Sequence, residues 1–327
     1  MYLVTGGAGF IGSNLVARLA ARGEALAVCD WLGQDERWRN LAHHEIAALV
    51  APEGLMQWLA RPPAPLQAIV HMGAISTTTE SDVDRLAQWN VRSTLELLQW
   101  CTEHQVRFIY ASSAATYGDG SAGFDDDARC EALATLRPLN AYGWSKHVVD
   151  RRVARLVQQG GALPPQCVGL KFFNVYGPNE YHKGGMQSVI ARNFARARAG
   201  EALQLFRSYR SDYADGGQLR DFIYVRDCID VMEWLLGEPR VSGLFNLGSG
   251  QARSWLDLAD ALSSACGQPR KVQFTDMPET LQGRYQYCTE ARMQRLREAG
   301  YHRPFTTLEA GVADYVRRYL CAADPYL

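Results

Sequence analysis

A glycine-rich stretch near the start of the chain, VTGGAGFIG, constrains the fold more than any other feature of the sequence. Gly6, Gly9 and Gly12 stand three apart, between an apolar run (2–5) and a segment with helical spacing of apolar residues (10–23). In such a unit the first glycine permits a tight turn and the second lets a pyrophosphate approach the backbone. The third lets the helix pack closely on the strand. Because a helix N-terminus stabilises an anion, the stretch predicts a dinucleotide-binding turn.

The next apolar run, ALAVCD (25–30), ends on Asp30, at the distance expected for a ribose-binding carboxylate. Asp30 would accept a hydrogen bond from an adenosine ribose hydroxyl, which favours NAD. Arg37 lies seven residues further on and could instead bind the 2′-phosphate of NADP. These two residues leave the choice of cofactor open.

Short apolar runs alternate with helix-length periodic segments through the first half of the chain. Strands are predicted over 2–5, 25–30, 66–74, 106–113 and 166–175, and helices over 10–23, 81–103 and 142–157. This alternation is typical of a parallel sheet that helices cover on both faces. We therefore expect an α/β fold built on a doubly wound parallel sheet of the Rossmann type.

Past about residue 175 the pattern loosens into loops, including a polar loop over 208–218, and helices. GLFNLGSG (243–250) is a late return to the sheet, and the last eighty residues predict two or three helices and a short strand, KVQF (271–274). The predicted division is a nucleotide-binding domain of 1–173 plus about 222–248, and a smaller C-terminal substrate-binding part of about 174–221 plus 249–327.

Composition argues against several classes of protein. The 327 residues carry a net charge of −1, which gives no support to nucleic-acid or membrane binding through bulk charge. No apolar run reaches the ~18 residues of a membrane span, and no signal peptide is visible. The eight cysteines are scattered and do not cluster with the seven histidines. We expect reduced thiols, a cytoplasmic location and no metal site.

Tyr142 and Lys146 stand four residues apart in LNAYGWSKH, so on a helix both side chains reach the same site. A phenol with an ordinary pKa near ~10 is a poor base at neutral pH. One positive charge ~6 Å away, at an effective dielectric constant of ~20, would lower the pKa by roughly two units. Tyr142 is therefore predicted to act as an acid–base group. A surface Tyr–Lys pair is the alternative.

Ser113 ends the predicted strand 106–113, where it could hydrogen-bond the same substrate oxygen as Tyr142. The glycine turn, Ser113 and the Tyr–Lys pair, in this chain order, resemble the extended short-chain dehydrogenase/reductase superfamily, whose members act on nucleotide sugars. The sugar dehydratases among them carry Asp-Glu directly after the catalytic Ser or Thr. Ala114 and Ala115 occupy those places here, which disfavours dehydration.

Lys183, in EYHKGGM, is one of only four lysines among the 34 basic residues. Inverting a carbinol centre places the oxygen of the keto intermediate differently for each epimer, and a second proton donor opposite Tyr142 would serve both places. Arginine does not release its proton near neutral pH, whereas a desolvated lysine can. A second acid–base group explains an amine at this position. A structural lysine or a phosphate contact is the alternative.

The resemblance narrows with HMGAISTTTE, YASSAATYGDG, PLNAYGWSKH, KFFNVYGPNEYHKGGMQSV, GGQLRDFIYVRD and LQGRYQY. From residue 1 to about 320 the chain is similar to the ADP-glyceromanno-heptose 6-epimerase family. That family interconverts ADP-D-glycero- and ADP-L-glycero-β-D-manno-heptose, inverting carbon 6, in making the lipopolysaccharide core. The resemblance implies NADP more than NAD, and a homo-oligomer, specifically a homopentamer.

The resemblance also implies roles for individual residues. Tyr142 and Lys183 become the two acid–base groups, one for each epimer, while Lys146 binds the cofactor ribose and polarises Tyr142. Further cofactor contacts are implied at Phe10, Ile11, Asp30, Trp31, Arg37, Met72, Gly73, Ala74, Ile75, Ser76, Asn90, Val175 and Lys183. Implied substrate contacts are Asn174, Gly185, Arg192, Leu205, Phe206, Arg207, Ser208, Arg220 and Tyr285, in addition to Ser113.

The chain departs from the family pattern at three places. Gly185 replaces a serine, Arg192 replaces a histidine, and EIAALVAPEG (45–54) lacks a short acidic turn that touches the adenine side. Two other functions remain open. A C4 epimerase of UDP-sugars needs only one tyrosine and gives no reason for Lys183. A non-catalytic NADP-binding protein has no need of a tuned phenol.

Overall fold

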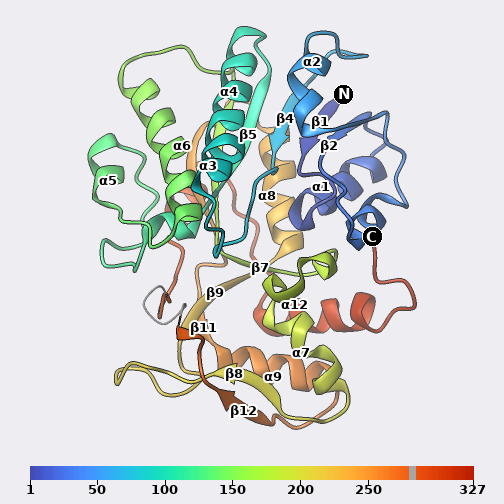
Figure 1. The fold of residues 1–327 in the computed structure, drawn as a ribbon, viewed down its shortest axis with the longest axis vertical. Helices are drawn as coiled ribbons and strands as arrows, with labels where there is room; N and C mark the ends of the chain where they lie inside the picture. Colours follow the sequence, from blue (N-terminus) through green and yellow to red (C-terminus); the bar gives the residue numbers. More distant parts are fainter. Residues whose placement is uncertain (280–284) are drawn as a thin grey trace.

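The computed structural model describes residues 1–279 and 285–327, and its largest element is a seven-stranded parallel sheet (Figure 1). The strand order is β10-β6-β5-β4-β1-β2-β3. The strands are β1 (Tyr2–Thr5), β2 (Leu26–Cys29), β3 (Ala48–Val50), β4 (Ala68–His71), β5 (Arg107–Ser113), β6 (Cys167–Phe172) and β10 (Gly243–Leu247). The predicted doubly wound α/β fold is confirmed. Of these strands only β3 was not predicted. It has three residues at the sheet edge, and the apolar run that contains it, IAALVA (46–51), was not interpreted as a strand.

Helices cover both faces of this sheet because successive strand residues point to opposite sides. Val4 packs in one apolar cluster with α1 (Phe10–Ala21) and α8 (Val225–Gly237). Its neighbour Leu3 packs in the opposite cluster. That cluster holds residues of α2 (Leu55–Leu59), α4 (Ser93–Glu103) and α6 (Ala141–Gln158).

The helix predicted over 81–103 is present as three joined pieces. It runs from α3 (Val83–Leu86) through a π-helical turn (Ala87–Arg92) into α4. The π-helical turn carries Asn90, which is fully buried. Such turns are frequent at functional sites. The short helix α5 (Cys130–Thr135) packs against α6.

The strand predicted over 166–175 is divided between two sheets. β6 ends at Phe172, and β7 (Asn174–Tyr176) joins a second sheet of order β11-β9-β7. The remaining members are β9 (Leu219–Tyr224), parallel to β7, and β11 (Ala252–Ser254), antiparallel to β9. Figure 1 shows β7 and β9 between the main sheet and the smaller part of the molecule.

The expectation of loops and helices past residue 175 is wrong at β9 and at β8 (Leu203–Phe206). Both strands carry polar residues that interrupt the apolar runs by which strands are recognised. β8 pairs with β12 (Val272–Thr275), which confirms the strand predicted at KVQF. The strand predicted within GLFNLGSG (243–250) is confirmed as β10, which lies at the edge of the main sheet.

Later described helices are α7 (Val189–Arg198), α9 (Trp255–Ala265), α11 (Gln294–Glu298) and α12 (Leu308–Tyr315), of which α11 packs against β10 of the main sheet. α7, α9 and α12 share an apolar core with β8 and β9. Among the described residues, no helix has both the length and the apolar character that crossing a membrane requires. The division of the chain into 1–173 plus about 222–248 and the remainder stays a prediction.

Candidate functional site

A cleft of about 910 Å³ opens at the carboxyl ends of β1, β2, β4, β5 and β6, where open α/β sheets bind their ligands. Its walls come from the glycine turn, the loop after β4, the start of α6 and the turn Tyr181–Met186. Phe222 of β9 and Trp255 of α9 also line it.

The glycine turn is as tight as its spacing predicts. Gly6 has φ +65° and lies so close to the loop after β4 that a Cβ would be 2.6 Å from the Gly73 nitrogen. A Cβ on Gly12 would be 2.1 Å from the Gly6 carbonyl oxygen. α1 starts at Phe10 without a side-chain cap from Gly9, and its first turn lines the cleft. The turn therefore fits the pyrophosphate of a dinucleotide.

Asp30 and Arg37 both line the cleft, but Arg37 already has a partner. Asp30 Oδ2 accepts a 2.9 Å hydrogen bond from the Ala8 N–H, and burial raises the pKa of Asp30. The Arg37 guanidinium binds Asp35 in a two-pronged fork, 2.9 Å from Nε to Oδ1 and 2.7 Å from Nη2 to Oδ2. Trp31 also lines the cleft, with its ring centroid 4.6 Å from that of Trp89.

The loop from Met72 to Ser76 lines the cleft, and Asn90 holds it from behind. The Asn90 side chain accepts a hydrogen bond from the Ile75 N–H (2.8 Å) and donates to the Ile75 carbonyl (3.0 Å). It also donates to Ser145 Oγ (3.0 Å), one turn along α6 from Tyr142. Asn90, a predicted cofactor contact, is thus placed behind the cleft wall.

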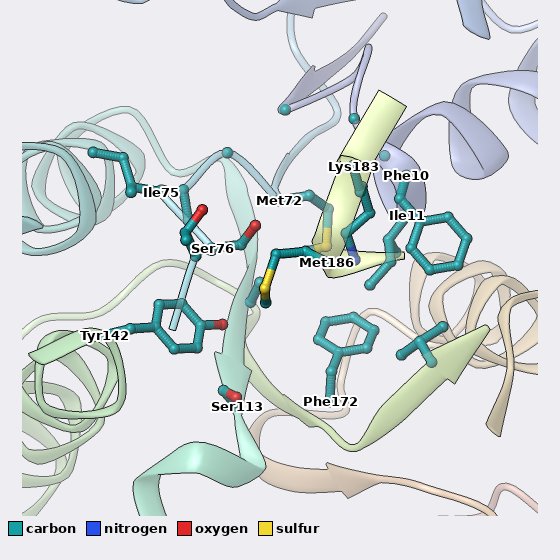
Figure 2. A pocket seen from close by; sticks show the side chains of 18 of the residues that line it. Phe10, Ile11, Met72, Ile75, Ser76, Ser113, Tyr142, Phe172, Lys183 and Met186 are labelled. Atoms are coloured by element: carbon teal, nitrogen blue, oxygen red, sulfur yellow. The ribbon is translucent and has the colours of Figure 1, made fainter. Parts of the chain in front are cut away.

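Tyr142, Ser113 and Lys146 meet in the cleft, as predicted from their spacing. The Asn140 side chain caps α6 by accepting from the Gly143 N–H at 2.8 Å. A Cβ on Gly143 would be 2.6 Å from the Ala115 carbonyl oxygen, so the helix start packs directly on the segment after Ser113. The Tyr142 and Ser113 hydroxyls are hydrogen-bonded, and Figure 2 shows both directed into the pocket.

Burial dominates the pKa values of this group. It raises the pKa of Tyr142, and only the hydrogen bond with Ser113 opposes that shift. Burial also lowers the pKa of Lys146 to about 8. Desolvation of the phenolate thus sets the direction of the Tyr142 shift, and the polarising role of Lys146 stays a prediction.

Lys183 enters the cleft from the Tyr181–Met186 turn, apart from Tyr142 (Figure 2). Its Nζ lies 5.1 Å from the centroid of the Phe10 ring. Burial lowers the pKa of Lys183, and the negative charge of Glu180 partly offsets that shift. The glycines after it allow a tight turn, since Gly184 has φ +52°.

Glu180 anchors this turn and was not singled out in the sequence. Its carboxylate is fully buried and accepts hydrogen bonds from the Ser188 hydroxyl (2.7 Å) and the Gly177 N–H (3.3 Å). Its place three residues before Lys183 was the available signal. Burial of a carboxylate, however, depends on distant residues that local sequence does not reveal.

The predicted substrate contacts separate into two groups. Ser113, Asn174 and Arg192 line the cleft, whereas Gly185 is exposed and does not. The predicted cofactor contact Val175 also lines it. Other predicted contacts lie beyond the cleft lining in the C-terminal part: Leu205, Phe206, Arg207, Ser208, Arg220 and Tyr285.

Arg220 is the most constrained residue of the second group. It is 5% exposed, and its guanidinium carbon lies 4.6 Å from the Tyr285 ring and 5.7 Å from Trp255. Burial lowers its pKa. Within residues 1–279 and 285–327 no carboxylate forms an ion pair with it. A buried guanidinium without a counter-ion favours an anionic ligand beside the aromatic wall of the cleft.

Ser113, Tyr142 and Lys146, gathered at the carboxyl edge of a doubly wound sheet with a glycine turn, define a Rossmann-fold enzyme of the extended short-chain dehydrogenase/reductase class. The chain belongs to the NAD dependent epimerase/dehydratase family, whose model matches residues 2–248. Several relatives of the chain carry names that specify one activity within this family. The chain is 50% identical over 330 residues to the ADP-L-glycero-D-manno-heptose-6-epimerase of Nitratidesulfovibrio vulgaris (strain Hildenborough), covering 100% of both.

It is 43% identical to the enzyme of the same name from Fusobacterium nucleatum, again over 100% of both chains. Among solved structures, the Helicobacter pylori ADP-L-glycero-D-manno-heptose-6-epimerase has a TM-score of 0.79 at 26% identity, covering 97% of this chain and 95% of that one. Thermus thermophilus UDP-glucose 4-epimerase in complex with NAD has a TM-score of 0.74 at 25% identity, covering 98% and 99%. The family resemblance predicted from the motifs is confirmed.

Proposed function

We propose that this chain is a cytoplasmic enzyme that interconverts ADP-D-glycero-β-D-manno-heptose and ADP-L-glycero-β-D-manno-heptose by inverting carbon 6. The observation that carries the proposal is that Tyr142 and Lys183, from different elements, both point into one cleft beside the glycine turn (Figure 2). Relatives over the full length of the chain bear the name of this activity.

A bound nicotinamide would supply the redox chemistry, taking a hydride from carbon 6 and returning it to the opposite face of the resulting ketone. Tyr142 takes the hydroxyl proton of one epimer, with Ser113 hydrogen-bonded to the same oxygen. Lys183 donates a proton to the carbonyl oxygen when the opposite configuration forms. One forward turnover leaves Tyr142 protonated and Lys183 neutral, so a proton must pass from Tyr142 back to Lys183 through solvent before the next turnover. In the reverse direction the two residues exchange roles.

Other residues support an epimerase that acts on a sugar diphosphate. Arg192 in the cleft and Arg220 behind Trp255 provide positive charge for a diphosphate. Ala114 and Ala115 line the cleft where a dehydratase would need carboxyl groups. The eight free thiols support the cytoplasmic location, and the family resemblance supports a homo-oligomer.

For the cofactor we propose NADP, with Arg37 binding the 2′-phosphate, and NAD as the alternative because Asp30 can accept from a ribose hydroxyl. Chromatography of the nucleotide released when the purified protein is denatured distinguishes the two. Recovery of NAD alone would overturn the NADP assignment.

The activity is tested by incubating purified protein with either epimer and following carbon 6 by NMR. We expect both reactions to approach the same mixture without added cofactor, and net accumulation of reduced cofactor would contradict epimerisation. Tyr142→Phe and Lys183→Met should each lower the rate by at least about 100-fold, a loss typical of removing a positioned acid–base group. Full activity of Lys183→Met would refute the two-group mechanism. A screen of ADP-, GDP- and UDP-sugars tests the C4-epimerase alternative.

A further inference from the structure

Lys171 is a buried lysine for which the proposed mechanism gives no role. It lies on β6, is 0% exposed and pairs with Asp150 of α6, whose side chain is also 0% exposed. Among the described residues, this is the only ion pair with both side chains fully buried. Because burying two charges is costly, such a pair is weak evidence of a contribution to stability alone.

The ammonium group of Lys171 contacts the segment that carries Ser113. Nζ donates to Asp150 Oδ2 at 2.8 Å and to Thr116 Oγ1 at 2.6 Å. The Thr116 hydroxyl in turn donates to the Ser113 carbonyl oxygen at 2.8 Å. Lys171 is therefore two hydrogen bonds away from the backbone of Ser113.

The carboxylate of Asp150 joins the same segment to the helix of the other two catalytic candidates. It accepts hydrogen bonds from Ser112 Oγ (2.7 Å) and Tyr110 OH (3.2 Å) on β5. On α6, Tyr142, Lys146 and Asp150 follow each other at intervals of four residues, so they share one face of the helix.

We propose that Asp150 and Lys171 form a positioning pair of the active site. The pair fixes the β5 segment of Ser113 against the α6 face of Tyr142 and Lys146, and Asp150 supplies the counter-charge of Lys146. The inference rests on the proposed function, because it assigns Ser113, Tyr142 and Lys146 to the reaction.

The groups around the pair define the expected electrostatic effect. Those facing Lys146 are His71 from β4, with Tyr142 and Asp150 from α6. Those facing Asp150 are Tyr110, Tyr117, Lys146, His147 and Lys171. Burial lowers the pKa of His71 to about 3, so His71 is neutral at working pH. The charge of Asp150 raises the pKa of Lys146 against the effect of burial.

Asp150→Asn removes that charge and leaves the positive charge of Lys171 uncompensated. Both changes disfavour a protonated Lys146. We therefore expect its titration midpoint to fall by about 1 pH unit, the order expected for one unit charge roughly one helical turn away.

The scarcity of lysine allows a direct measurement, because [ε-¹³C]lysine labelling of the full chain gives four NMR signals, assignable by single Lys→Arg replacements. Asp150→Asn should shift the Lys146 titration, whereas Arg18→Met should not. Arg18→Met is the matched control, since it breaks the Arg18–Asp230 pair between α1 and α8. An unchanged Lys146 midpoint in folded Asp150→Asn overturns the counter-charge role. If Asp150→Asn fails to fold, Asp150→Asn/Lys171→Met replaces it, with a downward shift still expected.

Thr116→Val tests the positioning role. It should lower kcat for epimerisation about 10-fold with little change in KM and no shift of the Lys146 titration. Unchanged kcat would overturn this link. Because the titration is read without turnover, an inactive wild-type protein would refute the proposed function while the NMR result still decides on the counter-charge.

Discussion

The two proposed acid–base side chains differ in how the protein changes their affinity for protons. Burial raises the pKa of Tyr142 and lowers that of Lys183, so the cleft favours the neutral form of both residues. A neutral phenol can donate a proton and a neutral amine can accept one, so this state serves the direction in which Tyr142 donates and Lys183 accepts. In the pH–rate profile for the direction in which Lys183 donates, the rate should begin to fall at a pH below that at which an ordinary lysine titrates.

A second single residue, Asp35, affects the choice between NADP and NAD. Its carboxylate holds the Arg37 guanidinium that a 2′-phosphate would need. Asp35→Asn should free that guanidinium and increase the NADP:NAD ratio of the nucleotide bound on purification by several-fold, as measured by chromatography after denaturation. Asp127→Asn breaks a fork of the same i, i+2 type with Arg129 and serves as the control. An unchanged NADP:NAD ratio would show that Asp35 does not compete with the 2′-phosphate for the Arg37 guanidinium.

At the scale of elements, the turn that carries Lys183 depends on a carboxylate that no solvent reaches. The Ser188 hydroxyl and the Gly177 N–H donate to Glu180 Oε1, and the Ser188 N–H donates to Oε2. Both oxygens therefore accept, and the N–H₂ of an amide in place of either one would meet a donor. Burial raises the pKa of Glu180, while these hydrogen bonds and Lys183 oppose that shift.

Glu180→Gln should therefore destabilise the fold by about 1–3 kcal/mol and lower kcat about 10-fold. Loss of the negative charge should lower the pKa of Lys183 further, which moves the alkaline limb of the donating direction to lower pH. Denaturant unfolding and pH–rate profiles provide the measurements. Glu36→Gln, at an exposed carboxylate in a neighbouring turn, is the control. An alkaline limb that moves to higher pH would contradict the predicted lowering of the Lys183 pKa.

Lys183 was singled out by the scarcity of lysine and by the chemistry of inversion, whereas short-range spacing was enough to predict the glycine turn and the Tyr142–Lys146 pair. Those features depend on neighbours within one or two helical turns. The sequence did not reveal the positions of Asn90 or Glu180, because their burial is set by residues far along the chain. The same reason explains β8 and β9, whose pairing partners rather than their own apolar residues make them strands.

For the whole molecule, buried histidines predict sensitivity to acid. Burial lowers the pKa of His71 to about 3 and those of His147 and His182 to about 4, against 6.5 for an ordinary histidine. Between pH 6.5 and 4 the unfolded chain therefore binds more protons than the folded one, and stability falls as pH falls. Asp126, with a pKa raised to about 6, acts in the opposite direction, as do Asp30, Glu180, Asp221 and Asp227, whose pKa values burial also raises. The predicted fall is the net of these two sets of groups.

We expect Tm to fall by about 5 °C or more between pH 7 and pH 5, as measured by scanning calorimetry. His71→Gln should make the fall smaller, whereas His302→Gln, at an exposed site, should leave it unchanged. A Tm that does not vary over this range would show that unfolding takes up no net protons there, which contradicts the prediction.

The passage of one backbone from β6 to β7 limits how this enzyme can be recombined with its relatives. The Phe173 N–H donates to the Leu247 carbonyl oxygen of β10 at 3.0 Å, and the next residue, Asn174, already belongs to the other sheet. A chimera that crosses over at this point would take β6, which belongs to the main sheet, from one parent and β7, which belongs to the second sheet, from the other. Grafting new sugar selectivity should therefore carry residues 167–176 as one block.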